Sequence, residues 1–184
     1  MNRPNSQSLV ATILMLILAT GAACAVAADG FTYKSKDGRL TVWVPAKPQI
    51  SEQNLPSTTG GPYKQITMAS ESNPSMFLAG ILDFRQDLAT TGSETSYLDT
   101  MLANMKAGFG NGFVMDRSDG TKDLVSSTGQ KGRQIKGIVQ GQRLIIRAFV
   151  GKHSIYMQQV VFPVNFKAGS KNADRFLDSL SITD

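Results

Sequence analysis

Cysteine and histidine are almost absent from this sequence. The chain has one cysteine, Cys24, and one histidine, His153. Zinc and copper sites are built mainly from these two residue types, so such sites are excluded in practice and we expect no cofactor. His153 follows Gly151-Lys152, which is typical of a solvated turn rather than of a general base. The Gly-x-Ser-x-Gly elbow of serine hydrolases is also missing, so we predict no catalytic residue.

Charge is almost absent from the N-terminal segment. Arg3 is the only charged residue before Asp29, and a long apolar run passes into small residues that end at Ala28. A positive start, an apolar stretch and a small-x-small site are the marks of a secretory signal. We therefore predict that residues 1–28 are a signal peptide. Residues 29–184 are then a single domain exported to the bacterial periplasm, where it is soluble after cleavage.

Two alternatives are open for this segment. Cys24 follows two alanines and is a candidate lipidation site that would tether the protein to a membrane. An uncleaved segment is about long enough to span a bilayer and would act as an N-terminal anchor. If residues 1–28 are removed, the only cysteine leaves with them, and the mature chain folds in an oxidising compartment without a disulfide.

Acidic residues are missing from a long part of the C-terminal half. Residues 124–173 include eight basic side chains and no acidic one. An excess of one charge favours partners of the opposite charge. We expect an anionic ligand, an envelope protein or, by peripheral association, an anionic membrane surface, rather than nucleic acid. The identity of the partner and the oligomeric state stay open.

The pattern of apolar residues predicts several strands. Alternating or β-branched segments bounded by glycine, proline and polar turns are typical of antiparallel sheets. The predicted strands cover residues 31–35, 39–44, 63–69, 76–84, 113–117, 124–126, 130–140, 143–150 and 154–162. Residues 51–62 are polar and contain Thr-Gly-Gly-Pro, which predicts a loop.

Two amphipathic helices interrupt the strands. A capping box of Thr91 and Glu94 predicts the start of the first helix. Ser170 is the predicted N-cap of the second helix. The apolar faces are Leu98, Leu102, Met105 and Phe109 in the first, and Ala173, Phe176, Leu177 and Leu180 in the second. The order of strands, helix, strands and helix predicts an α+β fold, an antiparallel sheet of about six to eight strands with at least one face covered by helices.

Basic residues on the predicted strand 143–150 form the candidate binding site. Alternation places Arg143 and Arg147 on one face with Ile145 and Phe149, while the other face is plainly apolar and belongs to the core. We predict that the arginine face is open and contacts an anion or a protein. The candidate residues on this strand and the preceding one are Arg143, Arg147, Lys131, Arg133 and Lys136. The alternative is a solvated sheet face whose arginines pair with acidic residues of the same domain.

Three aspartates raise the alternative of a calcium site, because hard cations bind clustered carboxylates. They are Asp116, Asp119 and Asp123. Their spacing does not match an EF-hand loop, and Arg117 and Lys122 lie among them. A polar β-turn explains the segment better, so we predict no metal site.

Two short stretches resemble a known family. Residues 37–45, Asp-Gly-Arg-Leu-Thr-Val-Trp-Val-Pro, are similar to the opening motif of the PsbP-like superfamily, which includes Mog-type proteins and bacterial envelope members. Residues 176–180, Phe-Leu-Asp-Ser-Leu, are similar to its closing helix. The resemblance implies an antiparallel sheet between helices and a non-catalytic binding or assembly protein. It transfers no functional residue.

These observations favour an exported, non-catalytic envelope protein that binds an anionic ligand or a partner protein as an accessory or assembly factor. The alternative is a small-ligand carrier, or an unrecognised hydrolase, with a pocket between sheet and helix. A pocket larger than a few waters and lined by converging polar groups would support that alternative.

Overall fold

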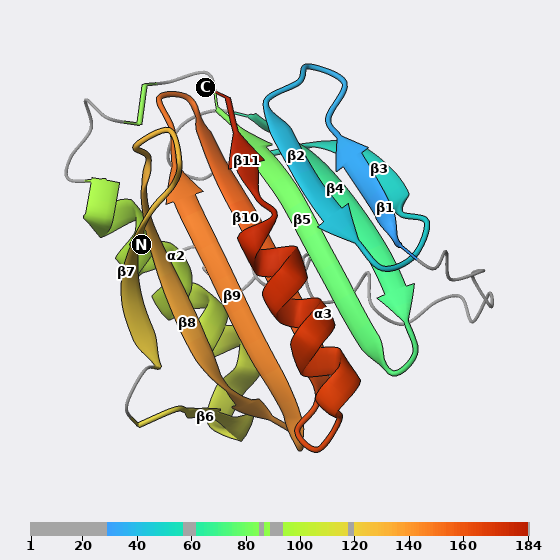
Figure 1. Cartoon of the computed structure of the whole chain (residues 1–184). Coiled ribbons are helices and arrows are strands. Elements are labelled where there is room, and N and C mark those ends of the chain that lie inside the picture. Colours follow the sequence, from blue (N-terminus) through green and yellow to red (C-terminus); the bar gives the residue numbers. More distant parts are fainter. Residues whose placement is uncertain (1–28, 57–61, 85–86, 89–93, 118–119, 184) are drawn as a thin grey trace.

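The computed structural model describes residues 29–56, 62–84, 87–88, 94–117 and 120–183. This part of the chain forms an eight-stranded sheet, a three-stranded sheet and two α-helices (Figure 1). Every strand pairing is antiparallel. The predicted α+β fold class is therefore confirmed.

The larger sheet has the strand order β3-β4-β5-β10-β9-β8-β6, and β7 also pairs with β8. Its strands are β3 (Gln49–Leu55), β4 (Tyr63–Ser72), β5 (Ser75–Asp83), β6 (Phe113–Met115), β7 (Thr121–Val125), β8 (Lys131–Val139), β9 (Gln142–Val150) and β10 (Ser154–Pro163). Tight turns join β4 to β5 and link β8, β9 and β10 into a meander, as the turn residues predict. Because β5 pairs with β10, the two halves of the chain meet in the middle of the sheet.

Strand β3 differs from the sequence prediction. Residues 51–62 are predicted to be a loop, yet Gln49–Leu55 pairs along β4 as an edge strand. An edge strand has one side open to water, so it needs few apolar side chains. Ile50, for example, is 43% exposed. A polar edge strand and a loop therefore have similar compositions, which explains the wrong prediction.

The smaller sheet covers part of one face of the larger one. Its strands are β1 (Phe31–Lys34), β2 (Leu40–Val44) and β11 (Ser181–Ile182), in the order β1-β2-β11. Leu40, Val42 and Val44 are buried against the larger sheet. The sequence does not predict this second sheet as a separate unit, because β11 has only two residues.

Helix α2 (Glu94–Phe109) covers the opposite face of the larger sheet (Figure 1). Its predicted apolar face is confirmed at Leu98 and Leu102, which are buried against β8 and β9. Thr91 of the predicted capping box lies outside the described residues, as does the side chain of Met105. The helix ends at a short 3-10 turn, η1 (Gly110–Gly112), where Gly110 has a φ of +59°.

Helix α3 (Lys167–Asp178) lies beside the smaller sheet on the near face in Figure 1. Its predicted start is wrong: Ser170 lies inside the helix, and Phe166 is the N-cap without a side-chain hydrogen bond. The first turn is fixed by packing instead, because Gly169 lies against Phe162 and Phe166 so closely that a Cβ would be 2.6 Å from the Phe166 ring. Neither helix of the described chain is long and apolar enough to cross a bilayer.

Both faces of the larger sheet are therefore covered. On one side, α3 and the smaller sheet enclose a cluster that includes Phe77, Tyr156 and Phe176. On the other side, α2 encloses a second cluster that includes Leu144 and Ile146. This layered arrangement decides which side chains of the sheet can reach a partner.

Candidate functional site

The arginine face of β9 is not open, which corrects the sequence prediction. Ile145 is 7% exposed and Phe149 is 6% exposed, and both belong to the core cluster beneath α3 and the smaller sheet. Alternation assigns the two faces of β9 correctly, but it cannot show that both of them are covered. Arg143 and Arg147 share this face, and each is held by partners within the chain.

Arg143 pairs with Asp116, which follows β6. The guanidinium donates a hydrogen bond to the Asp116 carboxylate. Lys136 of β8 lies on the same face, and its Nζ is 3.8 Å from the same carboxylate. Asp116 thus provides negative charge for both cations. The register brings Lys136 alongside Arg143 but leaves both within an internal ion-pair group.

Arg147 fastens the end of α3 to the sheet. Its Nε donates to Gln134 Oε1 at 2.9 Å, and its Nη1 donates to the Leu177 carbonyl at 2.8 Å and to Asp178 Oδ1 at 3.2 Å. The last carbonyls of a helix lack partners within the helix and carry partial negative charge, so a cation there is stabilising. Buried Gln158 adds a hydrogen bond from its Nε2 to the Phe176 carbonyl, at 2.7 Å.

Lys131 and Arg133 occupy the other face of β8, on the side of α2. The Arg133 guanidinium donates to the carboxylates of Asp99 on α2 and Asp123 on β7. These bonds hold the helix to the sheet. The five predicted site residues are therefore divided between two faces, and the register brings only Lys136 next to the arginines of β9.

The three aspartates of the calcium alternative do not come together as a group. Asp116 and Asp123 are bound to arginines on opposite faces of the sheet, and Asp119 lies outside the described residues. The described residues contain no group of three metal-ligating side chains. His153 lies in the turn between β9 and β10, where its backbone carbonyl accepts a hydrogen bond from the Phe84 amide at 2.8 Å.

A second ionic group joins the two sheets, and we call its members Asp37, Arg39, Asp83 and Ser154 the Arg39 clamp. Arg39 precedes β2, and its guanidinium donates to Asp37 Oδ2 at 2.8 Å, to Asp83 Oδ2 at 2.8 Å and to Ser154 Oγ at 2.7 Å. Ser154 is fully buried and donates in turn to Asp83 Oδ1 at 3.1 Å. Asp83 and Ser154 lie far along the chain from Arg39, so sequence reasoning missed this group.

The clamp shifts the pKa values of Arg39 and Asp37. The hydrogen bond to Asp83 raises the pKa of Arg39 above its ordinary value, although burial opposes this. Burial alone would raise the pKa of Asp37, but hydrogen bonds from Ser35 and Arg39 outweigh it and the pKa of Asp37 is lowered. The carboxylate of Asp37 is therefore stabilised in its charged form.

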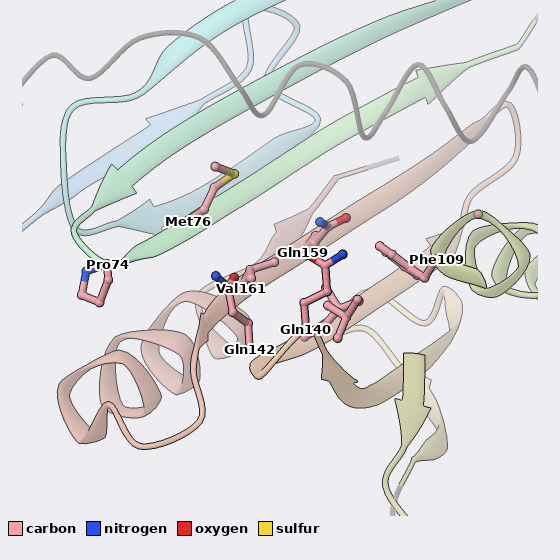
Figure 2. A pocket seen from close by; sticks show the side chains of 10 residues that line it. Pro74, Met76, Phe109, Gln140, Gln142, Gln159 and Val161 are labelled. Atoms are coloured by element: carbon pink, nitrogen blue, oxygen red, sulfur yellow. The ribbon is translucent and has the colours of Figure 1, made fainter. Parts of the chain in front are cut away.

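A pocket of about 400 Å³ lies on the α2 side of the larger sheet (Figure 2). It occupies the end of the sheet where the β4–β5 and β8–β9 turns approach the C-terminal end of α2. The lining residues are Pro74, Met76, Gly108, Phe109, Val139, Gln140, Gln142, Leu144, Gln159 and Val161. The turn containing His153 is at the opposite end of β9 and β10, so the only histidine is remote from this pocket.

Three carboxamides are the polar groups of the pocket. Gln159, on β10, is 4% exposed, whereas Gln140 and Gln142 are exposed beside the β8–β9 turn. Figure 2 shows them between Met76 on one side and Phe109 on the other. Among the described lining residues none is ionisable, so the pocket offers hydrogen bonds and apolar contact without a formal charge.

The sequence offers a pocket between sheet and helix as an alternative but does not identify the residues that line it, although one signal was present in the sequence. The predicted β8–β9 turn is Gly141-Gln142, but the turn lies one residue earlier, at Gln140-Gly141, where both residues have positive φ values of 49° and 77°. A two-residue turn of this kind favours asparagine or glycine at its first position. A glutamine there is unusual and could have drawn attention to this end of the sheet.

The two stretches that carry the family resemblance contact one another. The Trp43 amide donates to Ser179 Oγ at 2.8 Å, and the Arg175 guanidinium lies 4.1 Å from the centroid of the Trp43 ring. These contacts hold β2 against the end of α3. The resemblance therefore rests on residues that pack the smaller sheet and the helix together.

No protein-family model matches the sequence, and no curated protein matches it either. Among solved structures, the chain is similar to the solution structure of cyanobacterial PsbP (CyanoP) from Synechocystis sp. PCC 6803. The TM-score is 0.56 at 8% sequence identity, over 90% of this chain and 99% of that one. Likeness at this identity concerns the fold. The chain therefore has a PsbP-like fold, as the two short motifs predict.

Proposed function

We propose that this protein is a non-catalytic accessory protein that binds a partner molecule in the pocket between α2 and the larger sheet. The composition of the pocket lining carries the proposal. About 400 Å³ is within the range of ligand sites, which is about 300–1,000 Å³. Glutamine and apolar side chains can bind a ligand. The described lining residues provide no general acid, no general base and no nucleophile.

The fold and the family resemblance support the same proposal. The sequence motifs resemble a superfamily of mainly non-catalytic binding and assembly proteins, and the solved structure of CyanoP has a similar fold. The pocket also fits the small-ligand alternative of the sequence analysis, because converging polar groups line a space between sheet and helix. An anionic partner stays a prediction from the charge distribution.

We further propose that the protein acts outside the cytoplasm, in the bacterial periplasm. The apolar N-terminal segment and its small-residue site support export. The intact mass of the protein isolated from the producing cells tests this. A chain that begins near Asp29 is expected, whereas a lipid on Cys24 or an intact segment 1–28 would contradict the soluble form.

A capture experiment tests binding through the pocket. The tagged protein is recovered from the envelope of the producing cells, and bound molecules are quantified by mass spectrometry. Gln142→Glu places a charge at the pocket with almost no change in size, and the matched control Gln49→Glu changes an exposed glutamine of β3 that does not line the pocket.

We expect at least one molecule to be retained by the wild type and by Gln49→Glu but lost with Gln142→Glu. Equal retention by all three proteins would place binding elsewhere on the molecule. If the protein turned over a substrate at a rate that neither variant changed, it would be an enzyme whose active site is not this pocket.

A further inference from the structure

We infer that the pocket binds an uncharged, aliphatic peptide segment of a partner protein. This inference rests on the proposed function and names the class of its ligand. The three carboxamides, the neutral apolar wall and the backbone conformation of Gln140 support it.

The wall of the pocket selects against charge. Met76, Phe109, Val139, Leu144 and Val161 supply apolar surface, and the described lining includes no cation or anion. A charged ligand would lose hydration on entering and would gain no countercharge from these residues. The arginines of β8 and β9, which are Arg133, Arg143 and Arg147, are instead held in ion pairs. An uncharged ligand fits this wall best.

The carboxamides fit a peptide group. Each glutamine amide has an oxygen that accepts and a nitrogen that donates, so it can pair with the N–H and the C=O of a peptide bond. Gln159 presents its amide from the buried β10, while Gln140 and Gln142 present theirs from the edge of the pocket. A polypeptide backbone entering between them finds partners on both sides.

The backbone conformation of Gln140 supports the inference independently. It is the one non-glycine residue in the described chain with a positive φ, 49°. Residues with a side chain disfavour this conformation, and strained backbone of this kind often occurs at functional sites. Because glycine would relieve the strain, a glutamine at this position is best explained by a role for its side chain, which faces the pocket (Figure 2).

Two other ligand classes fit less well. A sugar would bring many hydroxyl groups against Met76, Val139 and Leu144, which cannot form hydrogen bonds with them. A purely apolar lipid would cover the buried carboxamide of Gln159 with hydrocarbon, and a polar group without a partner is destabilising. A peptide with small aliphatic side chains meets both the apolar wall and the carboxamides.

The test is a titration of the ¹⁵N-labelled protein, as isolated, with acetyl-Ala-Val-Ala-amide. The readout is the side-chain NH₂ signals of Gln140, Gln142 and Gln159. We expect saturable shifts of these signals at millimolar peptide, and no such shifts with acetyl-Ala-Glu-Ala-amide. Gln159→Met, which keeps the size and removes the carboxamide, should weaken binding at least several-fold.

Gln140→Gly is the second variant, because it removes a side chain from an exposed turn and leaves the core intact. It should also weaken binding several-fold, while Gln49→Glu should bind as the wild type does. Absence of shifts with the neutral peptide, or saturable binding of maltose or of decanol instead, would overturn the inference.

The capture experiment distinguishes a wrong ligand class from a wrong proposed function. If Gln142→Glu loses its partner in that experiment but the neutral peptide produces no shifts, the pocket is the binding site and the ligand class is wrong. If both experiments fail, the proposed function fails as well.

Discussion

The arginines of this protein act largely within the molecule. Arg39, Arg133, Arg143 and Arg147 each form hydrogen bonds with a carboxylate on another segment of the chain. The planar guanidinium has five donors and can hold several acceptors at once. Much of the positive charge in the C-terminal half therefore stabilises the fold instead of facing a partner.

Replacing Arg147 should test this at a single residue. Arg147→Met keeps much of the side-chain length but removes the donors to Gln134, the Leu177 carbonyl and Asp178. We expect the free energy of unfolding to fall by about 1–3 kcal/mol, the usual effect of leaving such acceptors without a donor. Urea unfolding followed by circular dichroism measures the change.

Lys171→Met is the control for Arg147→Met, because Lys171 is exposed on α3. It should change the free energy of unfolding by less than about 0.5 kcal/mol. If Arg147→Met were as stable as this control and lost a captured partner, the arginine would belong to a binding site, as the sequence predicts.

Replacing Gln140 should raise the free energy of unfolding, whereas replacing Arg147 should lower it. Its φ of 49° is unfavourable for a residue with a Cβ and acceptable for glycine. Gln140→Gly should therefore raise the free energy of unfolding by about 1 kcal/mol, while it weakens peptide binding. Gly141→Ala, at a φ of 77°, should lower stability instead. Thermal unfolding measures the change in stability of both variants. A destabilised Gln140→Gly would contradict the argument that the backbone is strained at Gln140.

Among the elements, we expect the Arg39 clamp to make the junction of the two sheets sensitive to acid. The folded state lowers the pKa of Asp37 below its ordinary value of 3.8. A carboxyl group with a depressed folded pKa contributes stability above its unfolded pKa and loses it as the pH falls through the folded value. We expect the free energy of unfolding to decline below about pH 4.

Asp37→Asn should reduce that decline, since the variant has no carboxyl group to protonate at this position. Urea titrations between neutral pH and acid measure the slopes. Asp174→Asn, on the exposed side of α3, is the matched control and should follow the wild type. Identical slopes for wild type and Asp37→Asn would show that the clamp does not contribute to acid sensitivity.

Elements with a strong apolar period were predictable from the sequence. Strands β4, β5, β8, β9 and β10 have alternating or β-branched apolar residues between turn residues, and the buried stripes of both helices stand out at helical spacing. The polar edge strand β3 and the two-residue β11 could not be predicted. They are strands because they pair with β4 and β2, and their own residues show no strand pattern. The start of α3 was missed because aromatic packing at Gly169, not a polar cap, fixes its first turn.

The candidate site was harder to predict than the elements. Alternation places Arg143 and Arg147 on one face of β9, but a single strand does not reveal that α3 and the smaller sheet cover it. The pocket draws its residues from α2, four strands and two turns. Only the strand order brings these segments together, so no local pattern could identify the lining as a whole.

At the scale of the whole molecule, the layers depend on contacts between distant parts of the chain. Ile182 of β11 is fully buried and pairs with Leu40 of β2. Ile182→Ala should lower the free energy of unfolding by about 2–5 kcal/mol, as expected for a large core side chain. The neighbouring Ser181→Ala, at an exposed position, should have little effect. Urea unfolding compares the two, and a neutral Ile182→Ala would show that β11 is dispensable.

The likeness to CyanoP is also a property of the whole molecule. At 8% identity, the two chains share few side chains, so what they share is the order and packing of their elements. Such packing can be maintained by many combinations of apolar residues of similar volume. A binding site, by contrast, depends on particular side chains, and the pocket of this protein has to be tested in this protein.

The pairing of β2 with β11 also governs when folding can be completed. The smaller sheet needs residues near both ends of the domain, so a chain still emerging from the ribosome lacks one side of it. Closing so long a loop is slow compared with forming a hairpin. The proposed export would gain from this delay, because the last layer of the fold forms only after the C-terminal strand has followed the rest of the chain across the membrane.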